Sequence, residues 1–163
     1  MMGDLFKTNS AIMSECGDYR YCLTRRWSDG PTCGFIMLNP STADADRDDP
    51  TIRRCISFAK REGCGGLIVV NLFAFRATSP KEMMCAYDPI GPENNWNFKL
   101  AIEEIDGPII AAWGNDGAFL GKGAAVAWRH GGVLKCFGHT RSGQPKHPLY
   151  VPGDAPLIPL VGP

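Results

Sequence analysis

The sequence lacks net charge, any cysteine pair with metal-binding spacing, and any apolar stretch long enough to cross a bilayer. Its 17 Lys and Arg residues balance 17 Asp and Glu residues, so no overall field draws the chain onto nucleic acid or an anionic membrane. No apolar run approaches the ~20 residues that a membrane-spanning helix needs, and residues 1–7 show no signal-peptide pattern. These absences predict a cytoplasmic protein with no membrane partner.

Without an overall positive charge, any nucleic-acid contact would depend on a local basic patch. The candidates are three groups of basic residues, each of which could equally be scattered, solvated charge: Arg20, Arg25 and Arg26; Arg53, Arg54, Lys60 and Arg61; Arg141 and Lys146.

The seven cysteines form no recognisable metal or redox motif. They are odd in number, spread along the chain and never spaced as Cys-x-x-Cys, which argues against a zinc site or a redox pair. Several have apolar neighbours and are expected to be small buried hydrophobes. No phosphate-binding glycine loop is present either. The sequence therefore predicts no cofactor.

Short apolar runs alternate with amphipathic segments, which is typical of an α/β domain. Buried strands are predicted at four apolar runs, residues 35–38, 67–73, 108–113 and 133–137. A strand at residues 19–27 is expected to pair antiparallel with the strand ending at Leu38. We therefore predict one domain, residues 1–163, with a three-layer α/β/α sandwich. Its central sheet is expected to be mainly parallel and four-stranded, with an added N-terminal antiparallel strand.

Helix signals fall between these strands. Asp49 followed by Pro50 is typical of an N-cap and a first helical residue, and the apolar residues that follow share one helical face. Ser79 predicts the start of a short helix, residues 93–105 form another, and a further helix ends near Trp128. Loops are expected at residues 42–49 and over most of the tail from residue 138.

Polar side chains lie where the predicted strands end. Asn39, Pro40 and Ser41 follow the first apolar run, Asn71 interrupts the second, and His147 lies in the tail after the last. In open α/β sheets ligands bind beyond the carboxyl ends of parallel strands. We therefore expect a pocket at this edge.

Asn71 and Asn39 each have two interpretations. A buried amide such as that of Asn71 needs partners. It either bonds a neighbouring loop or faces the hydrogen-bonding edge of a base, because a carboxamide offers one donor and one acceptor side. Asn39 is either a turn residue or a ligand for a water molecule.

Three further features could carry chemistry. The acidic residues Asp44, Asp46, Asp48 and Asp49 could cap a helix, supply a base or bind Mg²⁺. His147, held before a proline, is either structural or able to stabilise a departing anion. Arg76 either binds phosphate or pairs with an acid.

These motifs resemble two families. Residues 38–43, 48–51, 70–74 and 147–150 resemble the family with the domain of unknown function 1643, over nearly the whole chain. That resemblance implies no activity.

More distantly, the order of elements is similar to the uracil-DNA glycosylase superfamily. Residues 38–41 resemble its Asn-Pro loop, which implies that Asn39 positions the attacking water. Residues 69–71 resemble the strand whose final Asn reads a flipped pyrimidine, and residues 147–148 resemble its His-Pro loop. The chain differs from that pattern at Ser41, where Gly is common, and at Leu149, where Ser follows His-Pro. No iron–sulfur cofactor is implied, because the cysteine spacing is missing.

This second resemblance leads to a hypothesis of N-glycosidic hydrolysis on a nucleobase in DNA, with the base flipped into the pocket. The assignments are as follows: Asn39, Asp48 and His147 catalytic; Pro40, Ser41, Asn71 and Phe73 binding the base; Arg76, Arg141 and Lys146 meeting the backbone. Two alternatives remain open: a non-catalytic module that binds a nucleotide or modified nucleic acid, and a metal-dependent phosphohydrolase that uses residues 44–49.

Overall fold

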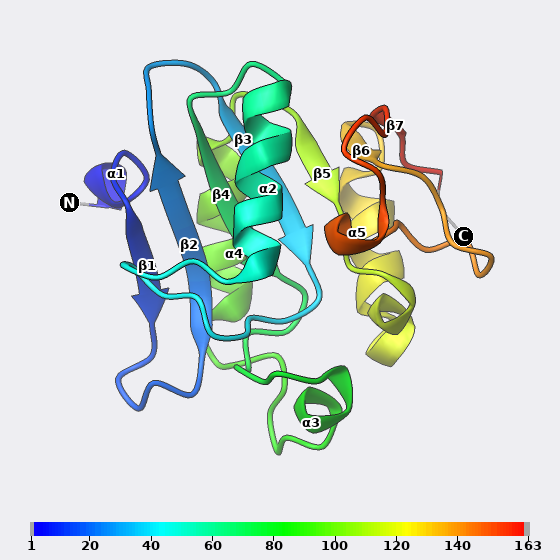
Figure 1. Ribbon diagram of the computed structural model, residues 1–163. Coiled ribbons are helices and arrows are strands. Elements are labelled where there is room, and N and C mark those ends of the chain that lie inside the picture. Colours follow the sequence, from blue (N-terminus) through cyan, green and yellow to red (C-terminus); the bar gives the residue numbers. More distant parts are fainter. Residues whose placement is uncertain (1, 162–163) are drawn as a thin grey trace.

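The computed structural model describes residues 2–161, which form a single mixed sheet with helices on both faces (Figure 1). Seven strands are found in this range, in the spatial order β1-β2-β4-β3-β5-β6-β7. Their bounds are β1 (Ser10–Met13), β2 (Arg20–Arg26), β3 (Thr32–Met37), β4 (Gly66–Asn71), β5 (Ile109–Ala111), β6 (Leu134–Cys136) and β7 (Ile158–Pro159). The prediction of an α/β fold is confirmed, but the sheet has more strands than expected.

The central strands β4, β3, β5 and β6 pair in parallel, whereas β1, β2 and β7 join antiparallel at the two sides. Every residue of β3 and β4 is buried, as their uninterrupted apolar runs predict for strands covered on both faces. The carboxyl ends of these parallel strands all meet at one edge of the sheet.

The helices divide between the two faces. The α-helices are α1 (Met2–Leu5), α2 (Pro50–Arg61), α3 (Pro80–Met84), α4 (Asn94–Glu104) and α5 (Lys122–His130), with 3₁₀ turns η1 (Asn115–Gly121) and η2 (Pro148–Tyr150). In Figure 1, α2 lies across the near face of the sheet, α4 lies behind it, and α3 lies beyond the carboxyl ends of β3 and β4. α2 packs on a cluster that includes Phe35 and Val69, whereas α4 and α5 contribute to the cluster around Ile36 and Val70.

The start of α2 is built as the sequence predicts. The side chain of Asp49 accepts a hydrogen bond from the backbone N–H of Ile52 at 2.9 Å, and Pro50 occupies the first turn. Buried Ile52, Cys55 and Phe58 then face the sheet. The cap thus holds the loop at residues 42–49 against the edge where the parallel strands end.

The expected pairing of residues 19–27 with the strand ending at Leu38 is wrong. β2 pairs antiparallel with β4, and β4 lies between β2 and β3. The turn between β2 and β3 passes over the start of β4, where the backbone carbonyl of Gly65 accepts hydrogen bonds from the N–H groups of Trp27 and Ser28. A Cβ atom at Gly65 would lie 2.4 Å from the carbonyl oxygen of Ser28, so this crossing needs glycine. The hairpin predicted for β2 and β3 does not form, because β4, which is distant in sequence, lies between them.

Two arginines of α2 hold the C-terminal segment. Arg54 donates from Nη2 to the carbonyl of Val151 at 2.6 Å and from Nε to that of Pro148, and Arg61 donates from Nη1 to the carbonyl of Ala155 at 2.6 Å. Their guanidinium groups also lie over the ring of Phe58. These two cations therefore position the segment after His147 and are not a free basic patch.

Five cysteines are buried and two, Cys16 and Cys85, are exposed, and all seven are free thiols. This matches the expectation that several serve as small core residues. None of the helices among residues 2–161 has the length and apolar character required to span a membrane.

Candidate functional site

A cavity of about 650 Å³ lies at the carboxyl edge of the parallel strands, between the loops that follow β3, β4, β5 and β6. It is lined by polar residues from segments far apart in sequence: Arg20, Asn39, Ser41, Asp49, Asn71, Asn115, Lys146 and His147. Met37, Ile52, Val69 and Trp113 add apolar surface. Asn39, Asn71 and His147 therefore border one space, as the position of ligand sites in open α/β sheets leads one to expect.

Asn71 forms the buried part of the cavity wall. It is the last residue of β4, opposite Met37 of β3, and its exposed fraction is 0%. Strand alternation places its side chain on the same face as Leu67 and Val69, which belong to the cluster under α2. Neither Nδ2 nor Oδ1 has a hydrogen-bond partner within residues 2–161. Because an unpaired buried amide is costly, this side chain is suited to a ligand that supplies both an acceptor and a donor.

Arg20 is a second polar group that borders the cavity with an unused donor. It is the first residue of β2, and because β2 runs antiparallel its start lies at the carboxyl edge of the parallel strands. The residue is 2% exposed, Nη1 donates to the carbonyl of Ala43 at 2.8 Å, and Nε has no partner among the described residues. Burial lowers the pKa of Arg20 to about 10, against the opposing charge of Asp49. A buried cation with a free N–H favours an anionic or carbonyl oxygen on the ligand.

Asp49 connects this site to the fold. Oδ1 caps α2, Oδ2 accepts from the backbone N–H of Ala43 at 3.4 Å, and the residue is 9% exposed. Its carboxylate also lines the cavity and is the main charge that stabilises the charged form of Arg20. One side chain thus ends a loop, starts a helix and compensates a buried cation.

Replacing Asp49 with alanine is expected to lower the free energy of unfolding by ~2–3 kcal/mol, because a lost N-cap costs ~0.5–2 kcal/mol and a buried charge loses its partner. Asp49→Asn keeps a capping oxygen and should cost less. Urea denaturation measures both. Ser79→Ala is the matched control, because Ser79 caps α3 at an exposed position and carries no charge that compensates a buried cation, and it should cost ~1 kcal/mol or less. Equal losses for Asp49→Ala and Ser79→Ala would contradict this account.

Two backbone carbonyls determine the orientation of the Asn39 amide. Nδ2 donates to the carbonyls of Pro40 at 3.1 Å and Ala77 at 3.0 Å, which lie on the loops after β3 and β4. Oδ1 is therefore the atom left to accept, and no donor from residues 2–161 bonds to it. This arrangement can hold a water molecule at the cavity wall.

His147 has a defined tautomer. Nδ1 accepts a hydrogen bond from the backbone N–H of Leu149 at 3.2 Å, so the neutral ring carries its proton on Nε2. Burial lowers the pKa of His147, and the nearby charge of Asp49 opposes that effect. The ring lines the cavity as a neutral donor at pH 7.

This lowered pKa makes a prediction about stability and pH. As the pH falls below 6.5, the unfolded chain binds a proton at residue 147 before the native protein does, so the free energy of unfolding should decrease. His147→Asn keeps an oxygen that can accept from Leu149 but does not titrate. Urea denaturation between pH 7.5 and 5.5 should show a smaller loss in His147→Asn than in the parent. The pKa of His130 is also lowered by burial. The difference between His130→Asn and the parent over the same pH range therefore measures the contribution of His130 to the loss of stability. An identical loss in His147→Asn and the parent would contradict the assignment.

Trp113 is a lining residue of the cavity that is 3% exposed and belongs to the buried cluster around Ile36 and Val70. Its indole N–H donates to Oε1 of Gln144 at 2.9 Å. A Cβ atom at Gly117 would lie 1.9 Å from Cδ1 of Trp113, so only glycine leaves room for the ring. Tyr150, 82% exposed, lies at the rim. The sequence predicted Phe73 as the aromatic residue that binds the base, whereas Trp113 and Tyr150 are the aromatic residues that border the cavity.

Three residues expected to bind a base or catalyse lie outside the cavity. Asp48 forms an ion pair with Arg25, with Oδ1 2.8 Å from Nε, and the cavity carboxylate on this loop is that of its neighbour Asp49. Phe73 is fully buried on the other face of the sheet, with its ring centroid 5.4 Å from that of Phe119. Pro40 is buried and contributes a carbonyl to Asn39 and to the backbone N–H of Ala77.

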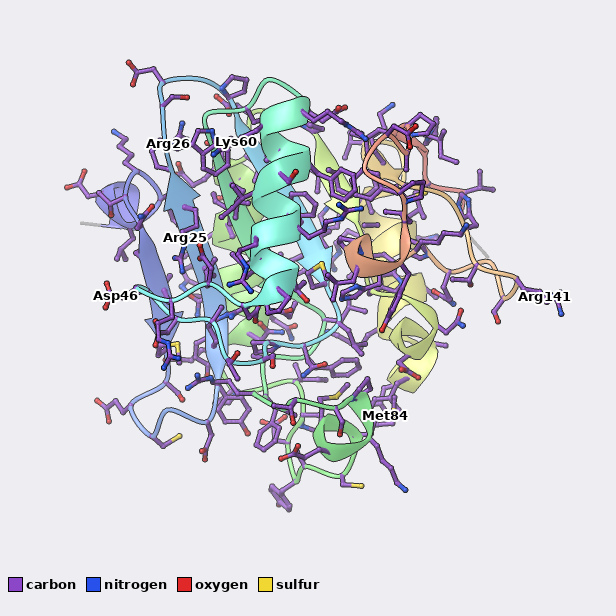
Figure 2. The ribbon with its side chains drawn as sticks, viewed as in Figure 1. Arg25, Arg26, Asp46, Lys60, Met84 and Arg141 are labelled. Carbon is purple, nitrogen blue, oxygen red and sulfur yellow. The ribbon has the colours of Figure 1, made fainter. Side chains whose placement is uncertain are left out.

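The basic residues expected to meet a nucleic-acid backbone have different positions. Lys146 lines the cavity and is exposed. Arg141 is exposed at the tip of the loop between β6 and η2, where Figure 2 shows it pointing away from the molecule. Arg76 donates to the carbonyls of Ser41 and Gly17 and does not line the cavity. Arg25, expected in a surface basic patch, is 5% exposed. Its guanidinium group donates hydrogen bonds to the side chain of Asp48 and to the backbone carbonyl of Asp44.

The carboxylates of the acidic loop serve separate structural tasks. Oδ1 of Asp44 accepts from the backbone N–H groups of Asp46 and Arg47, and these bonds lower the pKa of Asp44. Asp48 pairs with Arg25 and Asp49 caps α2. Over residues 2–161, no group of three or more His, Cys, Asp or Glu side chains is arranged to hold a metal ion.

Arg20 is the charged cavity residue that the sequence did not predict. An arginine followed by three apolar residues at the start of a strand was a signal, but the nearby Arg25 and Arg26 made a surface patch an equally good interpretation.

One comparison with known proteins gives a match. The model of a protein family described as "Protein of unknown function (DUF1643)" matches residues 20–149, a range that contains every cavity residue named above except Tyr150. Searches of curated proteins and of solved structures find no match.

Proposed function

We propose that this chain, which belongs to the DUF1643 family of proteins of unknown function, is an N-glycosidic hydrolase that releases a damaged or modified nucleobase from DNA. The observation that supports this most strongly is the amide of Asn71, fully buried at the cavity and with no partner for either polar atom among residues 2–161. A base presents a donor beside an acceptor on its edge, and a carboxamide matches that pattern. A cavity of about 650 Å³ is large enough for a flipped nucleotide.

The neighbouring groups divide the remaining tasks. Arg20 Nε donates to an exocyclic oxygen of the base. Ser41 borders the same space. Lys146 lies where flanking phosphate would emerge from the cavity, and Arg141 extends the positive charge outward. Zero net charge implies modest affinity that falls steeply with salt.

Hydrolysis uses Asn39 and His147. Oδ1 of Asn39 accepts a hydrogen bond from the attacking water, whose oxygen bonds to C1′ as the bond from C1′ to the base nitrogen breaks. The base leaves with the electron pair, stabilised by the Nε2–H of His147, and takes up a proton while the water gives one to solvent. These two residues favour a hydrolase over a non-catalytic binding module, because binding alone requires neither a free Asn39 oxygen nor a donor at His147.

The test is incubation of the full chain with single- and double-stranded oligonucleotides that carry uracil, hypoxanthine or hypermodified bases. Abasic sites are detected by alkaline cleavage and released bases by mass spectrometry, and binding is followed in parallel by fluorescence anisotropy. A released base supports the proposal. Saturable binding without release, at enzyme excess, would leave the binding module as the function. Neither binding nor release across the panel would overturn both.

A further inference from the structure

A second hollow lies on the opposite face of the sheet, between α4 and α5. Its volume is about 800 Å³, larger than that of the first cavity. Phe98 and Ile102 of α4 and Val126 of α5 form its apolar walls, and Trp128, 88% exposed, stands at its rim. None of the residues that line this hollow takes part in the function proposed above.

The charges around this groove are unbalanced. Three cations, Lys99, Lys122 and Arg129, line it, against one acidic residue, Glu103. The two ion pairs found among residues 2–161 involve none of these side chains. Lys122 has only a 3.4 Å hydrogen bond from Nζ to Oδ1 of Asn95, and burial lowers its pKa. The groove is therefore complementary to an anion.

Asn94 places an unused acceptor in the same groove. The residue is 1% exposed, and Nδ2 donates to the backbone carbonyls of Asn71 at 3.1 Å and Leu72 at 3.2 Å. Those two bonds exclude a flipped amide, so the atom without a partner is Oδ1. A buried acceptor at a cavity wall favours a ligand that carries an N–H or O–H group.

We propose that the α4–α5 groove is a binding site for a small organic anion with a flat apolar body and one hydrogen-bond donor. The anionic group meets Lys122 and its basic neighbours, the ring lies between Phe98 and Val126, and the donor bonds Oδ1 of Asn94. This ligand differs in class from a base in DNA, and its site is on the other face of the sheet.

The test uses indole-3-acetate as the probe, because it combines a carboxylate, an aromatic ring system and an N–H group. Two close analogues remove one feature each: indole-3-acetamide lacks the charge, and benzofuran-3-acetate lacks the N–H donor. Binding to the full chain is followed by ¹H–¹⁵N correlation spectra, with the side-chain signals of Asn94 and Trp128 as local reporters. A dissociation constant on the order of 1 mM or tighter is expected for a fragment of this size.

Each analogue is expected to bind about threefold to tenfold more weakly. Lys122→Met should lower the affinity for indole-3-acetate and leave that for the amide unchanged. Lys81→Met, an exposed lysine on α3 away from the groove, is the matched control and should have no effect. Asn71→Leu should also leave the affinity unchanged, which separates this site from the proposed base site.

Equal affinity for the acid and the amide, shifts centred on Asn39 and Asn71, or no saturable shift in α4 and α5 at millimolar probe would each overturn the proposal.

Discussion

Replacing Asn71 with leucine is expected to stabilise the protein and at the same time weaken base binding about 100-fold. Most substitutions of a hydrogen-bonded amide by an apolar side chain destabilise a protein, but both polar atoms of Asn71 are buried without partners in the part of the chain that the structure describes. Removing an unsatisfied buried group relieves a penalty of ~1–3 kcal/mol, and leucine has the same branching and number of side-chain heavy atoms, with the adjoining cavity to take its larger volume. The free energy of unfolding from urea denaturation should therefore rise by ~1–3 kcal/mol. Affinity falls because a bidentate amide–base pair contributes up to ~3 kcal/mol and a tenfold change is ~1.4 kcal/mol.

Asn94→Leu is the matched control for this stability effect. Asn94 is equally buried, but its Nδ2 bonds the carbonyls of Asn71 and Leu72. Its replacement leaves those carbonyls with one partner fewer and is expected to cost ~1–3 kcal/mol. Opposite signs for the two variants would support a ligand-directed role for Asn71. A loss of stability in Asn71→Leu similar to that in Asn94→Leu would contradict it.

Replacing Asn39 with alanine is expected to lower the rate of base release by a factor of ~10²–10⁴, the usual range for a group that positions or activates a nucleophile. Affinity for the same oligonucleotide should stay within about threefold, because in the proposed mechanism Asn39 contacts the attacking water and not the base edge. Single-turnover assays with enzyme in excess separate the two quantities. Loss of its bonds to the carbonyls of Pro40 and Ala77 also has a structural cost, which a thermal melt of the same sample reports.

Asn115→Ala provides the matched control for Asn39→Ala. Asn115 is another amide that lines the cavity, but it is exposed and its Oδ1 accepts from the hydroxyl of Thr140. Base release should change by less than about threefold. Equal rate losses in the two variants would indicate that the cavity tolerates no truncation, and a normal rate in Asn39→Ala would remove Asn39 from the mechanism.

Much of the local structure could be predicted because its causes lie within a few residues. The Asp49-Pro50 pair specifies the start of α2, Ser79 does so for α3, and the apolar run at residues 67–70 of β4 indicates a strand covered on both faces. The short edge strands β1 and β7 carry no such signal. β1 is only half-buried, and β7 has two exposed residues, so neither has a pattern that separates it from a loop.

The site was predictable only in part. Parallel strands end at one edge, and this rule suffices to bring Asn39, Asn71 and His147 to one cavity. The choice between Asp48 and Asp49 depends on a salt bridge with Arg25, which lies on a strand more than twenty residues earlier. Arg20 reaches the cavity only because β2 is antiparallel to β4.

By itself, then, the sequence determined the capped helix, the buried strands and the polar residues that follow them, because capping, alternation and proline geometry act locally. The tertiary structure alone decided that β4 lies between β2 and β3, that the Asn71 amide has no partner among the described residues, and that a basic groove opens between α4 and α5. The reason is physical: strand order and the pairing of buried polar atoms depend on contacts between residues far apart in the chain, and no periodic pattern along the chain records those contacts.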